Sequence, residues 1–226
     1  MDIAWIGHAA FRLRGREAAV VLDPCPSTTG FRLGRPQADI VTISNPAPEH
    51  GWDKGVAGEP VRLDAPGEYE IHNVLITGVV TNDHAAAADE PPVRNVAFVV
   101  TIDDVIVAHL GDLRGEPSPR AMEELSRADV LLVPVGGNGR LDAKTAVKVA
   151  GAIDPRLVIP MLHKVGPETA SLDTVDKFLS AMGLSATSGG ATESGSAPAE
   201  LDNHINVTRG GLGEHTAVQV LAPRGD

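Results

Sequence analysis

The stretch Ser-Asn-Pro-Ala-Pro-Glu-His at residues 44–50 carries the side chains best suited to chemistry in this chain. It begins at the end of the apolar run 38–44, which predicts a buried strand. Its last two residues, Glu49 and His50, place a carboxylate beside an imidazole. Both groups can ligate a divalent metal or transfer a proton. A loop at a strand end is also where functional side chains gather.

Other imidazoles and carboxylates occupy similar places. Asp23, His109 and Asp112 each lie at or just after the end of an apolar run, and His8 lies in a predicted turn. Asp23 and His109 also have structural explanations. Asp23 can accept hydrogen bonds from local backbone amides as a turn residue, and His109 can be a hydrogen-bonded core histidine. His8 can likewise cap its turn, so the sequence leaves both interpretations open.

Two further candidates are weaker. Cys25 would need a nearby base to lower its pKa before it could act as a nucleophile, and we favour a loop thiol without that role. The glycine-rich residues 136–139 precede a predicted helix and could cradle a phosphate at its N-terminus. They lack the spacing of a P-loop or a dinucleotide-binding fingerprint.

The elements that must position these residues form an α/β pattern. Fully apolar runs predict buried strands, and alternating runs near the N-terminus predict half-buried ones. Helices are predicted at residues 119–127 with Ser118 as cap, at 142–153 and at 171–182. The last two β-type runs, 205–209 and 216–221, could pair as a closing hairpin.

The chain is predicted to form a single domain over residues 1–226. It divides into two β-rich halves, about 1–93 and 94–226. Residues 185–200 are rich in Gly, Ser, Ala and Thr, a composition typical of a mobile loop.

Composition excludes several classes of function. The net charge of -11 and the lack of a Lys/Arg run argue against a nucleic-acid partner. No apolar run approaches the roughly 20 residues needed to cross a bilayer. A single cysteine and an N-terminus without signal-peptide features favour the cytoplasm. A small-molecule ligand and a homo-oligomer remain compatible with the sequence.

Short motifs in consistent order resemble one known family. They include Trp-Ile-Gly-His at 5–8, Pro-Gly-Glu-Tyr-Glu-Ile at 66–71, His-Leu-Gly-Asp-Leu at 109–113 and Ile-Pro-Met at 159–161. With them the chain resembles the small cytoplasmic hydrolases of the metallo-β-lactamase superfamily, in the branch that includes sugar-phosphate lactonases. The resemblance implies a four-layer αββα sandwich, with two mixed sheets face to face and the site in loops at one edge.

The resemblance also implies where metals would bind. The superfamily motif His-x-His-x-Asp-His falls on residues 45–50, and its two zinc ions lower the pKa of a bound water. Ligand positions of the first metal fall on Asn45, Ala47 and His84. Alanine cannot ligate and an asparagine amide is a poor zinc ligand, so we expect this metal site to be lost.

The second metal position retains more ligand types. Its positions fall on Glu49, His50 and Leu162, with His163 one residue late, and Asp112 falls on the aspartate that bridges the two metals. A further three residues, His8, Asp23 and His109, match polar positions that orient the ligands in the family.

Two functions follow as hypotheses. In one, the chain has lost catalysis and binds a small ligand or a partner, without a metal. In the other, it is a divergent single-metal hydrolase of a small ester, lactone or phosphorylated sugar. One divalent ion, Zn, Mn or Fe, would then bind at Glu49, His50, Asp112 and His163, with Asp112 and His50 as catalytic residues.

Overall fold

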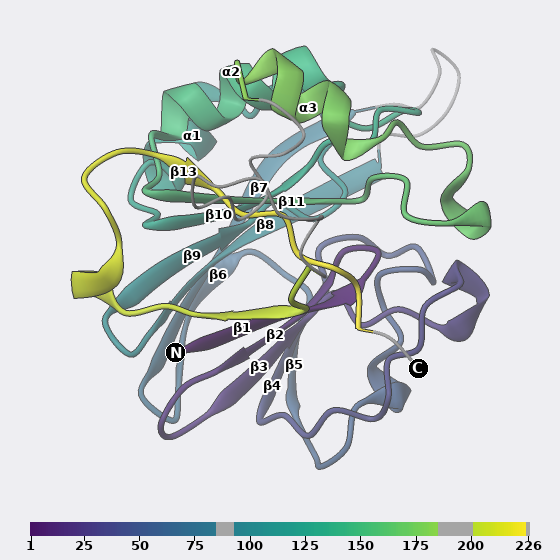
Figure 1. Cartoon of the computed structure of the whole chain (residues 1–226). Helices are drawn as coiled ribbons and strands as arrows, with labels where there is room; N and C mark the ends of the chain where they lie inside the picture. Colours follow the sequence, from purple (N-terminus) through teal and green to yellow (C-terminus); the bar gives the residue numbers. More distant parts are fainter. Residues whose placement is uncertain (85–92, 185–200, 225–226) are drawn as a thin grey trace.

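Two β-sheets packed face to face form the centre of the molecule (Figure 1). The structure, a computed structural model, describes residues 1–84, 93–184 and 201–224, apart from the side chains of 82–84 and 93. The loop predicted at 185–200 lies outside the described residues. No helix within the described ranges has the length and apolar character needed to cross a membrane.

The first sheet contains six strands among the described residues, and it is mixed. Neighbouring strands run parallel across β3, β4 and β5, and antiparallel elsewhere. Its order is β12 (His204–Asn206), β1 (Asp2–Gly7), β2 (Ala10–Arg14), β3 (Ala19–Leu22), β4 (Ile40–Thr42) and β5 (Val61–Leu63).

The second sheet contains seven strands within the same described ranges. Its order is β13 (Ala217–Val218), β11 (Leu157–Met161), β10 (Val130–Pro134), β9 (Val105–His109), β8 (Val93–Ile102), β7 (Val74–His84) and β6 (Gly67–Ile71). Every residue of β10 and β11 is buried, because both faces of this part of the sheet are covered.

The main core lies between the sheets. Trp5 and Phe11 from the first sheet join Phe98 from the second in one cluster of buried side chains. Side chains alternate along a strand, so the residues on the opposite faces belong to two further clusters. The two facing sheets confirm the predicted sandwich.

Helices cover the outer face of the seven-stranded sheet (Figure 1). They are α1 (Pro119–Leu125), α2 (Ala143–Ile153) and α3 (Val175–Ala181). Ser118 and Asp142 cap the first two through hydrogen bonds to Ala121 N and Thr145 N, as expected for such residues. The third begins later than predicted, because Thr174 has an extended backbone, forms an isolated bridge with Lys164 and becomes the N-cap. The 3₁₀ turn η3 (Pro167–Thr169) precedes it.

The outer face of the six-stranded sheet is covered differently. Loop residues Cys25, Leu33 and Val56 pack there against Val21 and Val41. The short 3₁₀ turns η1 (Ser27–Thr29) and η2 (Asp53–Gly55) belong to this layer. A loop layer therefore occupies the place that the sandwich prediction assigns to helices.

The predicted closing hairpin is wrong. β12 pairs antiparallel with β1, whereas β13 pairs parallel with β11 in the other sheet. Each strand thereby covers an otherwise open sheet edge, which a local hairpin would have left exposed. The C-terminal segment consequently ties the two sheets together.

Candidate functional site

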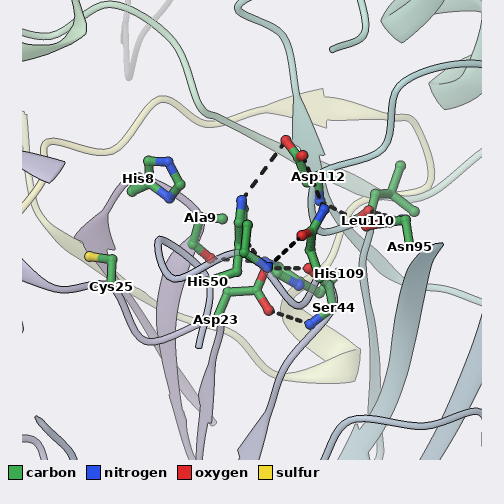
Figure 2. Close-up of polar contacts among 12 residues, drawn as sticks. His8, Ala9, Asp23, Cys25, Ser44, His50, Asn95, His109, Leu110 and Asp112 are labelled. Carbon is green, nitrogen blue, oxygen red and sulfur yellow. Dashed lines mark hydrogen bonds and ion pairs between the residues drawn. The ribbon is translucent and has the colours of Figure 1, made fainter. Parts of the chain in front are cut away.

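The strand ends bring Asp23, His50 and Asp112 together between the two sheets (Figure 2). Asp23 follows β3, has a left-handed backbone (φ 42°) and is fully buried. Its Oδ1 accepts a hydrogen bond from Ser44 N at 2.7 Å, and its Oδ2 accepts one from Ser44 Oγ at 2.5 Å. Burial alone would raise the pKa of Asp23, but His109 and the hydrogen bond with His50 lower it below its usual value.

His50 is oriented by this carboxylate. Its Nδ1 lies 2.9 Å from Asp23 Oδ2, and its side chain is only 1% exposed. Because a carboxylate accepts hydrogen bonds, it favours the proton on Nδ1. The other ring nitrogen, Nε2, then faces Asp112 Oδ1 at 3.9 Å.

Asp112 is surrounded by hydrogen-bond donors. Asn45 Nδ2 donates to its Oδ2 at 3.2 Å, and Arg114 donates to the same oxygen through Nε at 3.2 Å and Nη2 at 2.9 Å. Arg140 Nε forms an ion pair with Oδ1, without the angle of a hydrogen bond. One buried carboxylate is thus neutralised by two guanidinium groups.

The local backbone explains how Asp112 comes to this position. Its N–H donates to Asn95 Oδ1 at 3.0 Å, while Asn95 Nδ2 donates to Leu110 O at 3.0 Å. Gly111 has φ 60°, and a Cβ there would lie 2.3 Å from Ser44 Cβ. Only glycine therefore lets the end of β9 approach the loop after β4 this closely.

Two further histidines border the site. The ring of His8 lies 4.8 Å from that of His50, and its Nδ1 is buried without a hydrogen-bond partner. Burial, with the nearby charges of His50 and Arg140, lowers the pKa of His8 to about 3, so it is neutral at physiological pH. His109 Nε2 lies 2.9 Å from Ala9 O, and burial lowers the pKa of this histidine as well.

Of the four ligands expected for a single metal, His50 and Asp112 face each other, whereas Glu49 and His163 lie differently. Glu49 is exposed, and His163 packs its ring 5.0 Å from that of Trp5. The backbone of His84 ends β7, but its side chain is outside the description. Among the described residues, no three His, Cys, Asp or Glu side chains are arranged to hold a metal ion.

The one-residue offset of His163 has a structural basis. Leu162 occupies the position after β11 with a left-handed backbone (φ 52°) and buries its side chain in the main core. His163 Nδ1 lies 3.3 Å from Lys164 O, and burial lowers the pKa of its ring. A left-handed conformation is costly for a bulky residue and signals that the surrounding structure imposes it.

The surroundings of Cys25 do not favour a reactive thiol. Its buried thiol lies 4.0 Å from Gly7 O, and burial raises its pKa. A protonated thiol is a poor nucleophile, which supports the interpretation as a loop thiol. The glycine-rich loop at residues 136–139, considered above as a phosphate cradle, leads directly into Arg140, which forms an ion pair with Asp112.

The sequence interpretation did not identify Ser44, Asn95, Arg114 and Arg140. Ser44 and Asn95 act through Asp23 and the Asp112 backbone, which only the sheet packing brings close. The sequence positions of the two arginines could have indicated a place near the site. Arg114 lies two residues after Asp112, and Arg140 ends a glycine-rich loop that follows a predicted strand.

Comparisons with known proteins agree with this fold. The model of the β-lactamase superfamily domain matches residues 2–162. A UPF0173 metal-dependent hydrolase of Methanoculleus marisnigri is 30% identical over 191 residues, covering 74% of this chain and 83% of that protein. A UPF0173 metal-dependent hydrolase of Carboxydothermus hydrogenoformans is 24% identical over 205 residues, covering 76% of this chain and 88% of that protein.

A solved structure extends the similarity over nearly the whole chain. A proposed Zn-dependent hydrolase of the metallo-β-lactamase superfamily from Thermotoga maritima superposes with a TM-score of 0.75. The two chains are 29% identical, and 97% of each is covered. The chain therefore belongs to the β-lactamase superfamily, with the metallo-β-lactamase fold and with relatives that are named metal-dependent hydrolases.

Proposed function

We propose that this chain is a metal-independent member of its superfamily that binds a small anionic molecule. The observation that carries the proposal is the environment of Asp112, at the position that bridges two metals in the resemblance described above. Arg114, Arg140 and Asn45 occupy both of its carboxylate oxygens. We call the set of Asp112, its partners Asn45, Arg114 and Arg140, and the neighbouring Asp23 and His50 the Asp112 site.

Charge supports a site that works without metal. A bridging carboxylate needs compensating positive charge, because a buried ion without a partner is costly. Two guanidinium groups supply it here, and arginine stays protonated at any physiological pH. A divalent cation at Asp112 would have to displace these groups and would be repelled by them.

The same arginines favour an anionic ligand. Asp112 is 1% exposed, whereas the side chains of Arg114 and Arg140 are 29% and 19% exposed. A molecule that approaches from solvent therefore meets guanidinium N–H groups before it meets the carboxylate. The planar guanidinium fork matches the oxygens of carboxylates and phosphates.

A single-metal hydrolase is the alternative. It is favoured by the names of the relatives and by His50 Nε2, which faces Asp112 Oδ1 at 3.9 Å. In that case Arg140 would have to leave Oδ1 when the metal binds.

Metal content decides between the two functions. The protein is purified without chelator or affinity nickel and measured by mass spectrometry before and after incubation with zinc, manganese and iron. We expect substoichiometric metal, and no saturable rise of the melting temperature with zinc. Stoichiometric metal that is lost in His50→Ala and Asp112→Ala would refute the metal-independent proposal.

Anion binding tests the ligand class. Phosphate and acetate are titrated by calorimetry into the native chain and into Arg114→Gln. We expect binding that weakens by about tenfold in the variant, because one guanidinium partner is lost. Arg127→Gln is the matched control, because that side chain is 69% exposed on the surface near α1. Equal affinity in all three proteins would count against the Asp112 site as the anion site.

A further inference from the structure

A second concentration of arginine lies away from the Asp112 site. A pocket of about 280 Å³ opens beside β1, near the end of the described chain. It is lined by Asp2, Ala4, Ile6, Arg12, Asn203, His204 and Arg224.

The pocket lies on the outer face of the six-stranded sheet. Ile3 and Trp5 of β1 point into the main core, so the alternating side chains of Asp2, Ala4 and Ile6 point outward. Arg12 pairs with Ala4 across β1 and β2, which places it on the same face. The loop layer described above covers the neighbouring strands β3 and β4, and the pocket lies beside it.

The C-terminal segment forms the remaining wall. Arg224 N donates to Trp5 O at 3.0 Å, and Ala222 N donates to Asp202 O at 3.0 Å. These bonds fix the backbone that carries Arg224 alongside β1. His204 is exposed, and its Nδ1 lies 3.1 Å from Asn203 Oδ1.

The donors of the pocket exceed its acceptors. Arg12 Nε is buried and has no hydrogen-bond partner, which is a costly state for a charged group. Two guanidinium groups face one carboxylate, that of Asp2, among the lining residues. Burial lowers the pKa of Arg12, and the charges of Arg14 and Arg224 lower it further, against the opposing effects of Asp2 and Asp39. Positive charge is therefore incompletely compensated here.

We propose that this pocket is a second anion-binding site, built by Arg12 and Arg224 with His204 at its edge, for a small oxyanion such as a phosphate or carboxylate group. The anion accepts from Arg12 Nε, which supplies the missing partner, and from the guanidinium of Arg224. The proposal is independent of the function assigned to the Asp112 site, because no residue is shared between them.

Nuclear magnetic resonance separates this pocket from the Asp112 site by its local signals. Inorganic phosphate is titrated into the full chain, labelled with ¹⁵N, while the Arg12 Nε–H signal and the amides of Asn203, His204 and Arg224 are followed. Sodium chloride at matched ionic strength is the reference for screening. We expect a saturable shift of these signals with phosphate and no comparable shift with chloride.

Variants complete the test. Arg12→Gln and Arg224→Gln should each weaken the phosphate response at this pocket by about tenfold. Arg127→Gln, on the surface near α1, and Arg140→Gln, in the Asp112 site, should leave it unchanged. The proposal is overturned if chloride shifts the signals equally, if phosphate gives no saturable shift, or if Arg12→Gln and Arg224→Gln bind as tightly as the native chain.

Discussion

Removal of Arg140 tests the interpretation of Asp112 most directly. In Arg140→Gln, the carboxylate loses the ion pair at Oδ1 and keeps Arg114 and Asn45 at Oδ2. Breaking a buried ion pair by removal of one partner costs about 3–5 kcal/mol. Because Arg140 is 19% exposed and Asp112 keeps two partners, we expect the low end of this range, about 3 kcal/mol.

The assay is thermal and urea unfolding. For a domain of this size, 1 kcal/mol shifts the melting temperature by about 2–4 °C, so about 6–12 °C is expected. Arg140→Lys retains the charge but not the planar guanidinium group, so its melting temperature should fall between those of the native chain and Arg140→Gln. Arg127→Gln, a surface control with a 69% exposed side chain, should change stability by less than about 0.5 kcal/mol. An Arg140→Gln protein as stable as the control would refute the claim that Arg140 compensates Asp112.

Four further substitutions have defined outcomes. The pKa of His8 is lowered to about 3 in the folded protein. As the pH falls below about 6.5, the unfolded state therefore binds a proton before the folded state does, and the free energy of unfolding should drop by about 2 kcal/mol at pH 5. His8→Gln should remove this part of the acid sensitivity in unfolding curves measured between pH 7 and pH 5. Asp23→Asn should lose about 3 kcal/mol, because it disrupts the hydrogen bonds with Ser44 and His50, and unchanged urea unfolding would contradict that arrangement. Gly136→Ala should destabilise strongly, because the new Cβ would lie 2.0 Å from Leu162 O, whereas Gly151→Ala, with open space in α2, should stabilise by up to about 1 kcal/mol.

Much of the fold could be predicted from local sequence. The apolar runs became β10 and β11, and Ser118 and Asp142 capped helices as their side-chain chemistry requires. These features depend on residues within one turn or one strand of each other. The predicted closing hairpin was wrong because β12 and β13 pair with strands far away in the sequence, β1 and β11. Local strand propensity carries no information about such distant partners.

The candidate site shows the same division. Motif order was sufficient to indicate the superfamily, and to show that Asn45 and Ala47 stand at two ligand positions. It could not show that Asn45 donates to Asp112 or that Glu49 points to solvent. A side chain's direction depends on loop conformation and on what packs around it, and neither is encoded within a short motif.

The sequence by itself therefore determined the family, the strand and helix types and the residues available for chemistry. Only the tertiary structure decided their electrostatics. Arg114 and Arg140 lie 26 positions apart in the chain, and they meet at one carboxylate because β9 and β10 are parallel neighbours whose ends face the same edge. Charge compensation is a property of distances in space, so it appears only after the sheets are packed.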